Sequence, residues 1–258
     1  MKEKKVYMCD KKLFGLVGKN IEYSFSRDYF SKKFKTLDLD NHSYQNFDLK
    51  SIDDLVAVFS KNSPFLKGLN VTIPYKERVG DFLDEIDPVA ESIGAINTVK
   101  IETSGKKTGF NTDVYGFENS LKPLLKESHK NALILGTGGA SKAVAHVFKK
   151  LDIDYKFVSR NPTNENQITY SSISSDLLST TTVLVNCSPL GTSPATHLCP
   201  DLPYKALTAN HLLYDLIYNP SETTFLRLGK EQGATIKNGL EMLVLQAERS
   251  WKIWNSVT

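Results

Sequence analysis

Hydrophobic and polar positions along the chain form short apolar runs, most of them followed by stretches with the spacing of an amphipathic helix. Apolar runs bounded by Gly, Pro, Asn or Ser are typical of strands, and apolar residues recurring every three or four positions are typical of helices. Their alternation predicts an α/β protein. The segments expected as strands are residues 13–17, 34–39, 66–73, 97–101, 106–110, 131–135, 154–158, 182–186, 212–217 and 234–237.

The expected helices begin at residues suited to a helix start. A helix is expected over residues 51–62, with Ser51 as its cap and Asp54 in the capping-box position. Thr223 is expected at the start of another helix. Pro74 is expected at the first position of a helix, which places Lys76 in a first turn. The remaining helices are expected after Ser24 or Ser26, over residues 114–126 with Asp113 as cap, and over residues 140–150 and 239–251.

Length and composition narrow the class of protein. A chain of 258 residues is long enough to split into two domains, and 40% hydrophobic with 24% charged residues is ordinary for a globular protein. A net charge of +3 gives no reason to expect nucleic acid as a partner, and no apolar stretch is long enough to span a membrane. Cys9, Cys187 and Cys199 lack the number and spacing of a disulfide framework or a zinc site, which favours the reducing cytoplasm and no metal.

Polar side chains gather in the stretch from Gly68 to Asp113. Lys76 and Asp113 stand among neutral hydrogen-bonding groups, the side chains of Thr72, Asn97, Asn111 and Thr112. An amine and a carboxylate in such company suit proton transfer at a hydroxyl or carbonyl of a polyol. Most lysines are solvated surface residues, but a lysine at a helix N-terminus is expected to have a lowered pKa and to exchange a proton readily.

A second pattern starts after the polar segment 126–130. Gly136, Gly138 and Gly139 form a glycine-rich turn between an apolar strand and a helix, the context of a dinucleotide-binding fingerprint, with Ser141 in place of the third glycine. The next strand ends in Ser159-Arg160, where an NAD-specific domain carries an acidic residue. A hydroxyl and a guanidinium suit the 2′-phosphate of NADP instead.

Several of these segments, in this order, resemble the signature blocks of the shikimate dehydrogenase family. They are NVTIPYK at 70–76, IGAINTV at 93–99, GFNTDVYGF at 109–117, GTGGASKA at 136–143 and CSPLGT at 187–192, followed by YNPSETTFL from Tyr218 and the helix from Gly239 that carries MLVLQA. The resemblance implies a substrate-binding and catalytic domain over residues 1–115, completed by a helix over 239–258 that packs back on it. Residues 116–238 would form a Rossmann-like NADP-binding domain.

The resemblance also implies an activity, the interconversion of 3-dehydroshikimate and shikimate with NADPH in the biosynthesis of aromatic amino acids, and roles for individual residues. Lys76 and Asp113 would be catalytic. Substrate would be bound by Ser24, Ser26, Thr72, Asn97, Tyr218 and Gln246. The cofactor would be bound by Gly136, Gly138, Gly139, Ala140, Ser159, Arg160, Ser188, Gly239 and Met242.

Two departures from the family pattern flank the serine pair, Tyr23 in place of a histidine and Arg27 in place of a proline. They leave open a catalytically silent binding or regulatory relative, and an NAD-dependent quinate/shikimate dehydrogenase is a second alternative. Partners would be the small-molecule substrate and cofactor, without nucleic acid or membrane, and the protein would act as a monomer or homodimer.

Overall fold

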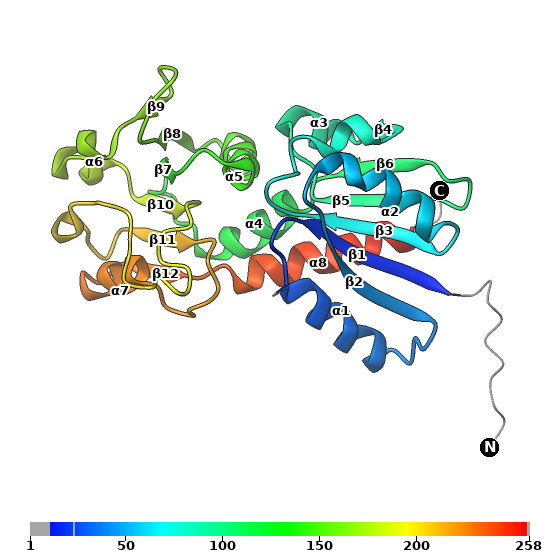
Figure 1. Cartoon of the computed structure of the whole chain (residues 1–258). Helices are drawn as coiled ribbons and strands as arrows, with labels where there is room; N and C mark the ends of the chain where they lie inside the picture. The colour runs from blue at the N-terminus through cyan, green and yellow to red at the C-terminus, as the bar shows by residue number, and fades with distance from the viewer. Residues whose placement is uncertain (1–10, 23, 257–258) are drawn as a thin grey trace. The chain divides into compact units, whose positions relative to one another are not determined.

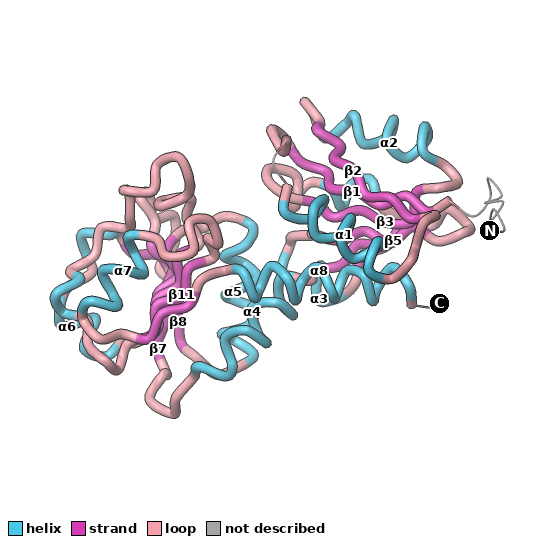
Figure 2. The backbone as a smooth tube through the Cα atoms, turned by 90° about the horizontal axis from the view of Figure 1, so that it is seen from below, coloured by secondary structure: helices cyan, strands magenta, loops and turns pink. Residues whose placement is uncertain are grey.

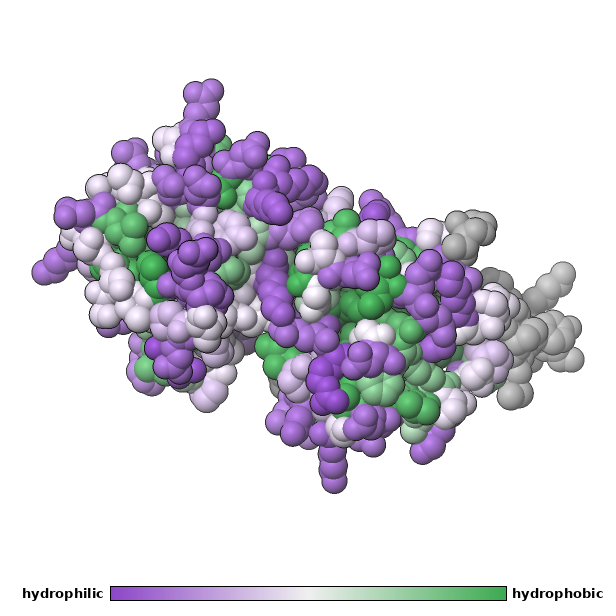
Figure 3. Space-filling model, turned by 90° about the horizontal axis from the view of Figure 1, so that it is seen from above, coloured by the Kyte–Doolittle hydropathy of each residue, from purple (hydrophilic) through white to green (hydrophobic). Residues whose placement is uncertain are grey.

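The computed structural model describes residues 11–22 and 24–256. The chain divides into two compact units, which we call unit 1 (residues up to Thr112 and from Ala247) and unit 2 (residues Asp113–Gln246). These divisions differ from the boundaries expected after residues 115 and 238. On the face shown in Figure 3, hydrophilic residues cover much of each unit, and hydrophobic residues gather in patches between them.

Unit 1 is built on a mixed six-stranded sheet in the order β2-β1-β3-β5-β6-β4 (Figure 1). Strand β1 pairs parallel to β2 and β3, β5 pairs antiparallel to β3 and β6, and β4 pairs parallel to β6. The predicted hairpin through Gly105 is confirmed. The elements are β1 Lys12–Gly18, α1 Phe25–Thr36, β2 His42–Asp48, α2 Leu55–Asn62, β3 Leu66–Val71, β4 Glu85–Ile86, α3 Pro88–Ile93, β5 Thr98–Ile101 and β6 Lys107–Phe110, with the last part of α8 Leu240–Asn255.

The strand expected over residues 34–39 is wrong. Phe30 and Phe34, four residues apart, bury one face of α1, so the helix continues through this segment to Thr36. The strand comes later, as β2. Its sequence is mostly polar because β2 lies at the edge of the sheet and buries only Tyr44 fully, and an edge strand of this kind lacks the apolar run that marks a buried one.

The last part of α8 belongs to the core of unit 1 (Figure 2). Trp254 packs with Phe14 and Phe30, and its indole Nε1 donates to the Val99 carbonyl oxygen at 3.0 Å. A Cβ on Gly68 would lie 2.3 Å from that indole, so glycine lets the helix approach the sheet. The expectation that the C-terminal helix packs on the first domain is confirmed.

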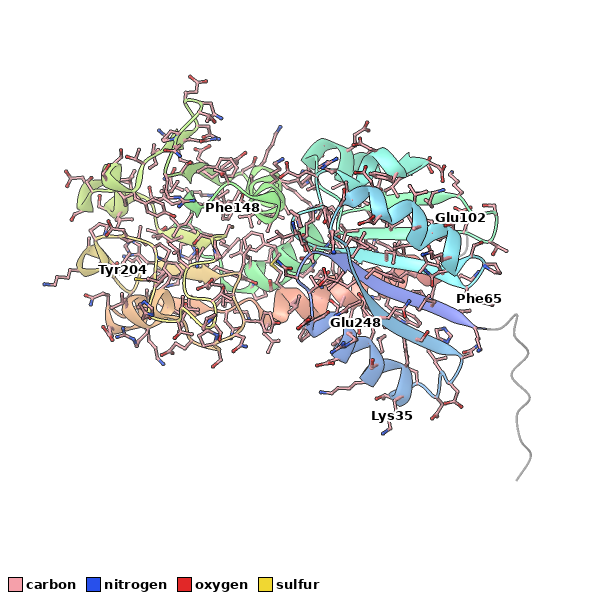
Figure 4. The ribbon with its side chains drawn as sticks, in the orientation of Figure 1. Lys35, Phe65, Glu102, Phe148, Tyr204 and Glu248 are labelled. Atoms are coloured by element: carbon pink, nitrogen blue, oxygen red, sulfur yellow. The ribbon has the colours of Figure 1, made fainter. Side chains whose placement is uncertain are left out.

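A polar contact adds to this packing between α8 and α1. Lys33 Nζ lies 2.7 and 2.9 Å from the two carboxylate oxygens of Glu248, which also accepts from the Tyr29 hydroxyl. Figure 4 labels Glu248 on α8. The cation and the phenol together hold the carboxylate, and the bonds lower the pKa of Glu248 although burial acts to raise it.

Unit 2 is built on a parallel six-stranded sheet in the order β12-β11-β10-β7-β8-β9, a Rossmann-like arrangement (Figure 1). Its core joins strand residues to helix residues such as Phe148 of α5, which is fully buried (Figure 4). The elements are α4 Asp113–Leu121, β7 Asn131–Leu135, α5 Gly139–Lys150, β8 Asp154–Val158, β9 Gln167–Ile168, α6 Ser175–Thr180, β10 Val183–Asn186, β11 Leu212–Asp215, α7 Thr224–Glu231 and β12 Thr235–Lys237.

Several helices have ends that differ from the prediction. A short 3₁₀ segment over Ile52–Asp54 precedes α2, which begins only at Leu55, and α5 begins one residue early, at Gly139. Helix α4 includes Asp113 itself and ends at Leu121, because Pro123 cannot supply the N–H that a continuing helix needs and a short 3₁₀ turn follows. Helix α8 runs on to Asn255, beyond the expected end at residue 251. Within the described residues, no helix has the length and apolar character needed to cross a membrane.

Candidate active site

Lys76 lies in a series of tight turns after β3, and the helix predicted from Pro74 is wrong. Tyr75 N and Arg78 N donate to carbonyl oxygens three residues back, and a short 3₁₀ segment begins only at Val79. Tyr75 is buried and its hydroxyl donates to the Leu49 carbonyl at 2.7 Å, which anchors the turns to the rest of unit 1. Lys76 therefore does not lie in the first turn of a helix, and the expected activation by a helix N-terminus is wrong.

Backbone hydrogen bonds bring three of the predicted residues together at the carboxyl end of β3. Thr72 N donates to the Val17 carbonyl at 2.9 Å, and the carbonyl of Lys76 accepts from Ile96 N at 2.8 Å. One residue further on, the carbonyl of Asn97 accepts from Val71 N at 2.8 Å. Main-chain hydrogen bonds thus hold Thr72, Lys76 and Asn97 close to one another. A backbone that is fixed in this way positions its side chains more precisely than a flexible loop does.

The amide of Asn97 is fixed by Thr112. Its Oδ1 accepts from Thr112 N at 2.7 Å and from the Thr112 hydroxyl at 3.1 Å, and both residues are buried. The side-chain amide of Asn111, the residue before Thr112, donates to the Ala95 carbonyl at 2.8 Å. Its side chain therefore supports the segment before β5.

The serine pair lies at the start of α1, as predicted. Ser24 is the N-cap, and its hydroxyl accepts from Arg27 N at 3.3 Å. A proline at position 27, as in the family pattern, would have no N–H to give Ser24. Ser26 is buried and makes a side-chain hydrogen bond with Tyr44. Tyr23 lies outside the described residues.

Asp113 and Gln246 both lie in unit 2, at opposite ends of its chain segment. Asp113 opens α4 and is buried, and Gln246 on α8 is also buried. Gly116, three residues after Asp113, lies against this part of α8: a Cβ there would be 2.5 Å from the Met242 carbonyl oxygen and 3.2 Å from Gln246. The first turn of α4 thus packs against the stretch of α8 that carries two predicted site residues.

The glycine-rich turn meets a second predicted segment. Gly136 has a φ of +113°, and a Cβ on it would lie 3.3 Å from the Cys187 carbonyl carbon and from Ser188 N. Strand β7 runs between β8 and β10, so the turn and the Ser188 segment meet where the order of strands reverses. In sheets of this kind ligands bind outside the carboxyl ends of the strands at that point.

This turn fits the pyrophosphate of a dinucleotide. Gly138 is the N-cap of α5, a twelve-residue helix, and a Cβ on it would meet nothing within 4 Å. Free N–H groups at a helix start attract phosphate. Ser141, in place of the third glycine, is fully buried, and its hydroxyl donates to the Gly138 carbonyl at 2.6 Å. The small serine thus reinforces the turn.

The segment after β8 is shaped by Ser159. Its N–H donates to the Ile168 carbonyl at 2.9 Å, and its hydroxyl accepts from Asn161 N at 3.2 Å, which curls the chain around exposed Arg160. Burial and the neighbouring Cys187 raise the pKa of Tyr170, and the charge of Arg160 opposes that rise. Arg160 thus stands at the strand end where ribose specificity is set in such folds.

Two predicted residues lie after β11. Tyr218 is 39% exposed. Gly239 lies against Leu216, whose carbonyl oxygen would be 2.1 Å from a Cβ, so glycine is required there. No group of three or more His, Cys, Asp or Glu side chains suited to a metal ion occurs among residues 11–22 and 24–256.

Sequence reasoning missed Asp215, the last residue of β11. Its side chain is fully buried, and burial raises its pKa to about 6 even though Thr223, Ile217 N and Asn186 all donate to it. The signal was a carboxylate at the end of an apolar run, LLYD. A buried carboxylate with a perturbed pKa at the carboxyl edge of a parallel sheet is a candidate functional residue.

The fold and the turn at Gly136 define a two-unit α/β protein that binds a dinucleotide. A model of the shikimate dehydrogenase substrate binding domain matches residues 16–99. The shikimate dehydrogenase (NADP(+)) of Desulforamulus reducens is 35% identical, over 95% of this chain and 90% of its own. The chain belongs to the shikimate dehydrogenase family.

Solved structures agree with this assignment. A shikimate dehydrogenase in complex with NADP+ has a TM-score of 0.84 at 33% identity, covering 96% of this chain and 91% of its own. The quinate dehydrogenase of Corynebacterium glutamicum, in complex with NAD, has a TM-score of 0.85 at 26% identity, covering 96% of this chain and 94% of its own.

Proposed function

We propose that this protein is an oxidoreductase that interconverts 3-dehydroshikimate and shikimate in aromatic amino acid biosynthesis, with NADP(H) as hydride carrier. The observation that carries the proposal is the presence, in one chain of this family, of a matched substrate-binding domain over residues 16–99 and the glycine turn at Gly136. The matched domain indicates the substrate class. The turn at Gly136 provides a binding site for the cofactor, which we call the cofactor seat.

For the substrate, we propose that Lys76 moves the proton at the ring oxygen and that Asp113 supports it electrostatically. When bound, the nicotinamide supplies the hydride, so the protein has to orient the substrate and handle one proton. The main-chain bonds that assemble Thr72, Lys76 and Asn97 support this arrangement. Further substrate contacts are proposed for Ser24, Ser26, Thr72, Asn97, Tyr218 and Gln246.

For the cofactor, we propose that the turn from Gly136 to Ala140 holds the pyrophosphate and that Ser159 and Arg160 hold the 2′-phosphate. The φ of Gly136 and the open surroundings of Gly138 support the first part, and the absence of an acidic residue at positions 159 and 160 supports the second. Ser188, Gly239 and Met242 are proposed as further contacts.

A single assay tests the activity. Purified protein is mixed with shikimate or quinate and with NADP or NAD, and the absorbance of the reduced nicotinamide is followed. We expect the highest kcat/KM with shikimate and NADP. The NAD complex of the similar quinate dehydrogenase makes quinate with NAD the second candidate. Absence of turnover with every pair would overturn the proposal and favour a silent relative.

We further propose that the protein works in the cytoplasm, as a monomer or homodimer. Cys187 and Cys199 are free thiols in the described part of the chain, as suits a reducing compartment. Sedimentation equilibrium distinguishes the two oligomeric states.

A further inference from the structure

Asp215, at the end of β11, is buried and does not reach the surface at which a cofactor would bind. The carboxylate is 0% exposed, so it cannot touch a bound dinucleotide. Its Oδ1 accepts from Asn186 Nδ2 at 3.0 Å and from Ile217 N at 3.0 Å, and its Oδ2 accepts from the Thr223 hydroxyl at 2.6 Å. Asp215 therefore joins the end of β10, the end of β11 and the N-cap of α7.

The bond to Asn186 determines which way that amide points. Asn186 Oδ1 accepts from Ser188 N at 3.0 Å and from the Ser188 hydroxyl at 2.7 Å, and its Nδ2 donates to the Leu190 carbonyl at 3.3 Å. The reverse orientation would set an N–H donor against Ser188 N–H and an oxygen against the Asp215 carboxylate. Only one orientation satisfies both neighbours.

The oriented amide in turn shapes the segment that meets the glycine turn. An Asn side chain that accepts from the N–H two residues on closes a tight turn of the backbone. Here that N–H belongs to Ser188, and it is the atom that a Cβ on Gly136 would approach within 3.3 Å. A shift of the turn at Ser188 would therefore also move the backbone packed against Gly136, in the turn proposed to hold the pyrophosphate.

We propose that Asp215 is a positioning residue for NADP: through Asn186 it fixes the turn at Ser188 against Gly136. The proposal rests on the proposed function, because it concerns the same cofactor seat. It assigns a task to a fully buried carboxylate whose raised pKa shows that burial disfavours its charge.

The chain offers a matched pair of variants to test this. Asn186 and Thr223 are both buried and both donate to Asp215. Of the two, Asn186 also accepts hydrogen bonds from Ser188, whereas Thr223 caps α7. NADP is titrated into purified Asn186→Ala and Thr223→Val by calorimetry, with the thermal midpoint of each free protein as a measure of folding. We expect Asn186→Ala to weaken NADP by about tenfold and Thr223→Val to leave the NADP affinity unchanged. The KM for shikimate should stay the same in both.

A conservative variant separates orientation from charge. In Asp215→Asn the amide oxygen can take the place of Oδ1 and still accept from Asn186 and Ile217, while its amide N–H faces the Thr223 hydroxyl, which can accept. We expect its NADP affinity to stay within about twofold of the wild type. If Asn186→Ala does not fold, Asn186→Asp replaces it, since it has the same shape but sets two carboxylates together.

The outcomes are distinct. Failure of the wild type to bind NADP contradicts the proposed function. If the wild type binds but Asn186→Ala and Thr223→Val lose the same affinity, or neither loses any, Asp215 does not position the cofactor seat. A large loss in Asp215→Asn also overturns the inference, because it would make the charge rather than the orientation decisive.

Discussion

At the scale of single residues, Lys76 owes its place to main-chain contacts. Its carbonyl accepts from Ile96 N, and the turn before it is anchored by the buried phenol of Tyr75. No helix start contributes, so any special reactivity has to come from neighbours within the site. The family role of the lysine is therefore open to a direct test.

Replacing Lys76 tests that role. We expect Lys76→Ala to lower kcat by ~10²–10⁴-fold, the usual effect of losing a positioned acid or base, with a smaller change in the KM for shikimate. Steady-state kinetics provide the measurement. Lys67→Ala, at the start of the same strand β3, is the control and should turn over normally. Normal kcat with only a raised KM in Lys76→Ala would make the lysine a binding group.

Arg160 decides the choice of cofactor if it binds the 2′-phosphate. A hydrogen bond to a charged group is worth about 1.5–3 kcal/mol, so Arg160→Ala should weaken NADP by roughly 10- to 150-fold. NAD affinity should hardly change. Arg227→Ala, which removes an exposed guanidinium paired with Glu231 on α7, is the control. Equal losses for both cofactors would show that Arg160 supports the fold or the pyrophosphate.

At the scale of elements, a buried set of polar side chains joins the sheet of unit 1 to α8. The Ser250 hydroxyl lies 3.0 Å from Asn70 Nδ2, 2.8 Å from the Thr98 hydroxyl and 3.2 Å from the Thr112 hydroxyl. Asn70 Oδ1 accepts from the Tyr44 hydroxyl at 2.9 Å. Since the Tyr44 proton is used in this way, Ser26 is the donor in its bond with Tyr44. Strands β2, β3 and β5 are thus linked to α8 and to the start of α1.

Removing the Tyr44 hydroxyl should disturb this link. Tyr44→Phe leaves the buried Asn70 Oδ1 without that donor, which costs about 1–3 kcal/mol of unfolding free energy. Urea denaturation measures the loss. Tyr155→Phe, on β8 in the other unit, makes the same chemical change away from the link and is the control. An unchanged midpoint for Tyr44→Phe would mean that the link does not stabilise unit 1.

At the scale of the whole molecule, Asp215 ties stability to pH. Its pKa in the folded protein is about 6, above the ordinary value of 3.8, so the folded state holds the proton more tightly than the unfolded state. The stability contributed by that proton is complete below about pH 4 and is lost as the pH rises through 6. Burial raises the pKa values of Cys187 and Tyr204, and the charge of Asp215 adds to both rises, so these groups do not titrate in this range.

Asp215→Asn removes this titration. We expect the unfolding free energy of the variant, relative to the wild type, to rise by about 2–3 kcal/mol between pH 4 and pH 7, at 1.36 kcal/mol per pKa unit. Denaturation midpoints at several pH values test this. Asp176→Asn makes the same charge change at an exposed position of unit 2 and is the control. A relative stability independent of pH would contradict the raised pKa of Asp215.

Much of the fold was predictable because its signals are local. Residues 131–135 and 154–158 form strands with the predicted bounds. Residues 131–135 are a nearly continuous apolar run, as in a buried strand of a parallel sheet, whereas residues 154–158 alternate exposed positions with less exposed ones. The glycine turn before α5 was also predictable, because a positive φ requires a particular residue type at one position. The edge strand β2 and the turns around Lys76 were not, because their stability comes from partners distant in sequence.

By itself the sequence determined the α/β class, most strands and helices, the glycine turn and, through its motifs, the family. Only the tertiary structure decided which of these residues meet. Gly136 touches the Ser188 segment because β7 and β10 pair, and Asp215 reaches Asn186 because β10 pairs with β11. Neither contact has a sequence signature, since the free energy of such a contact depends on burial and hydrogen-bond geometry that arise only when the strands come together.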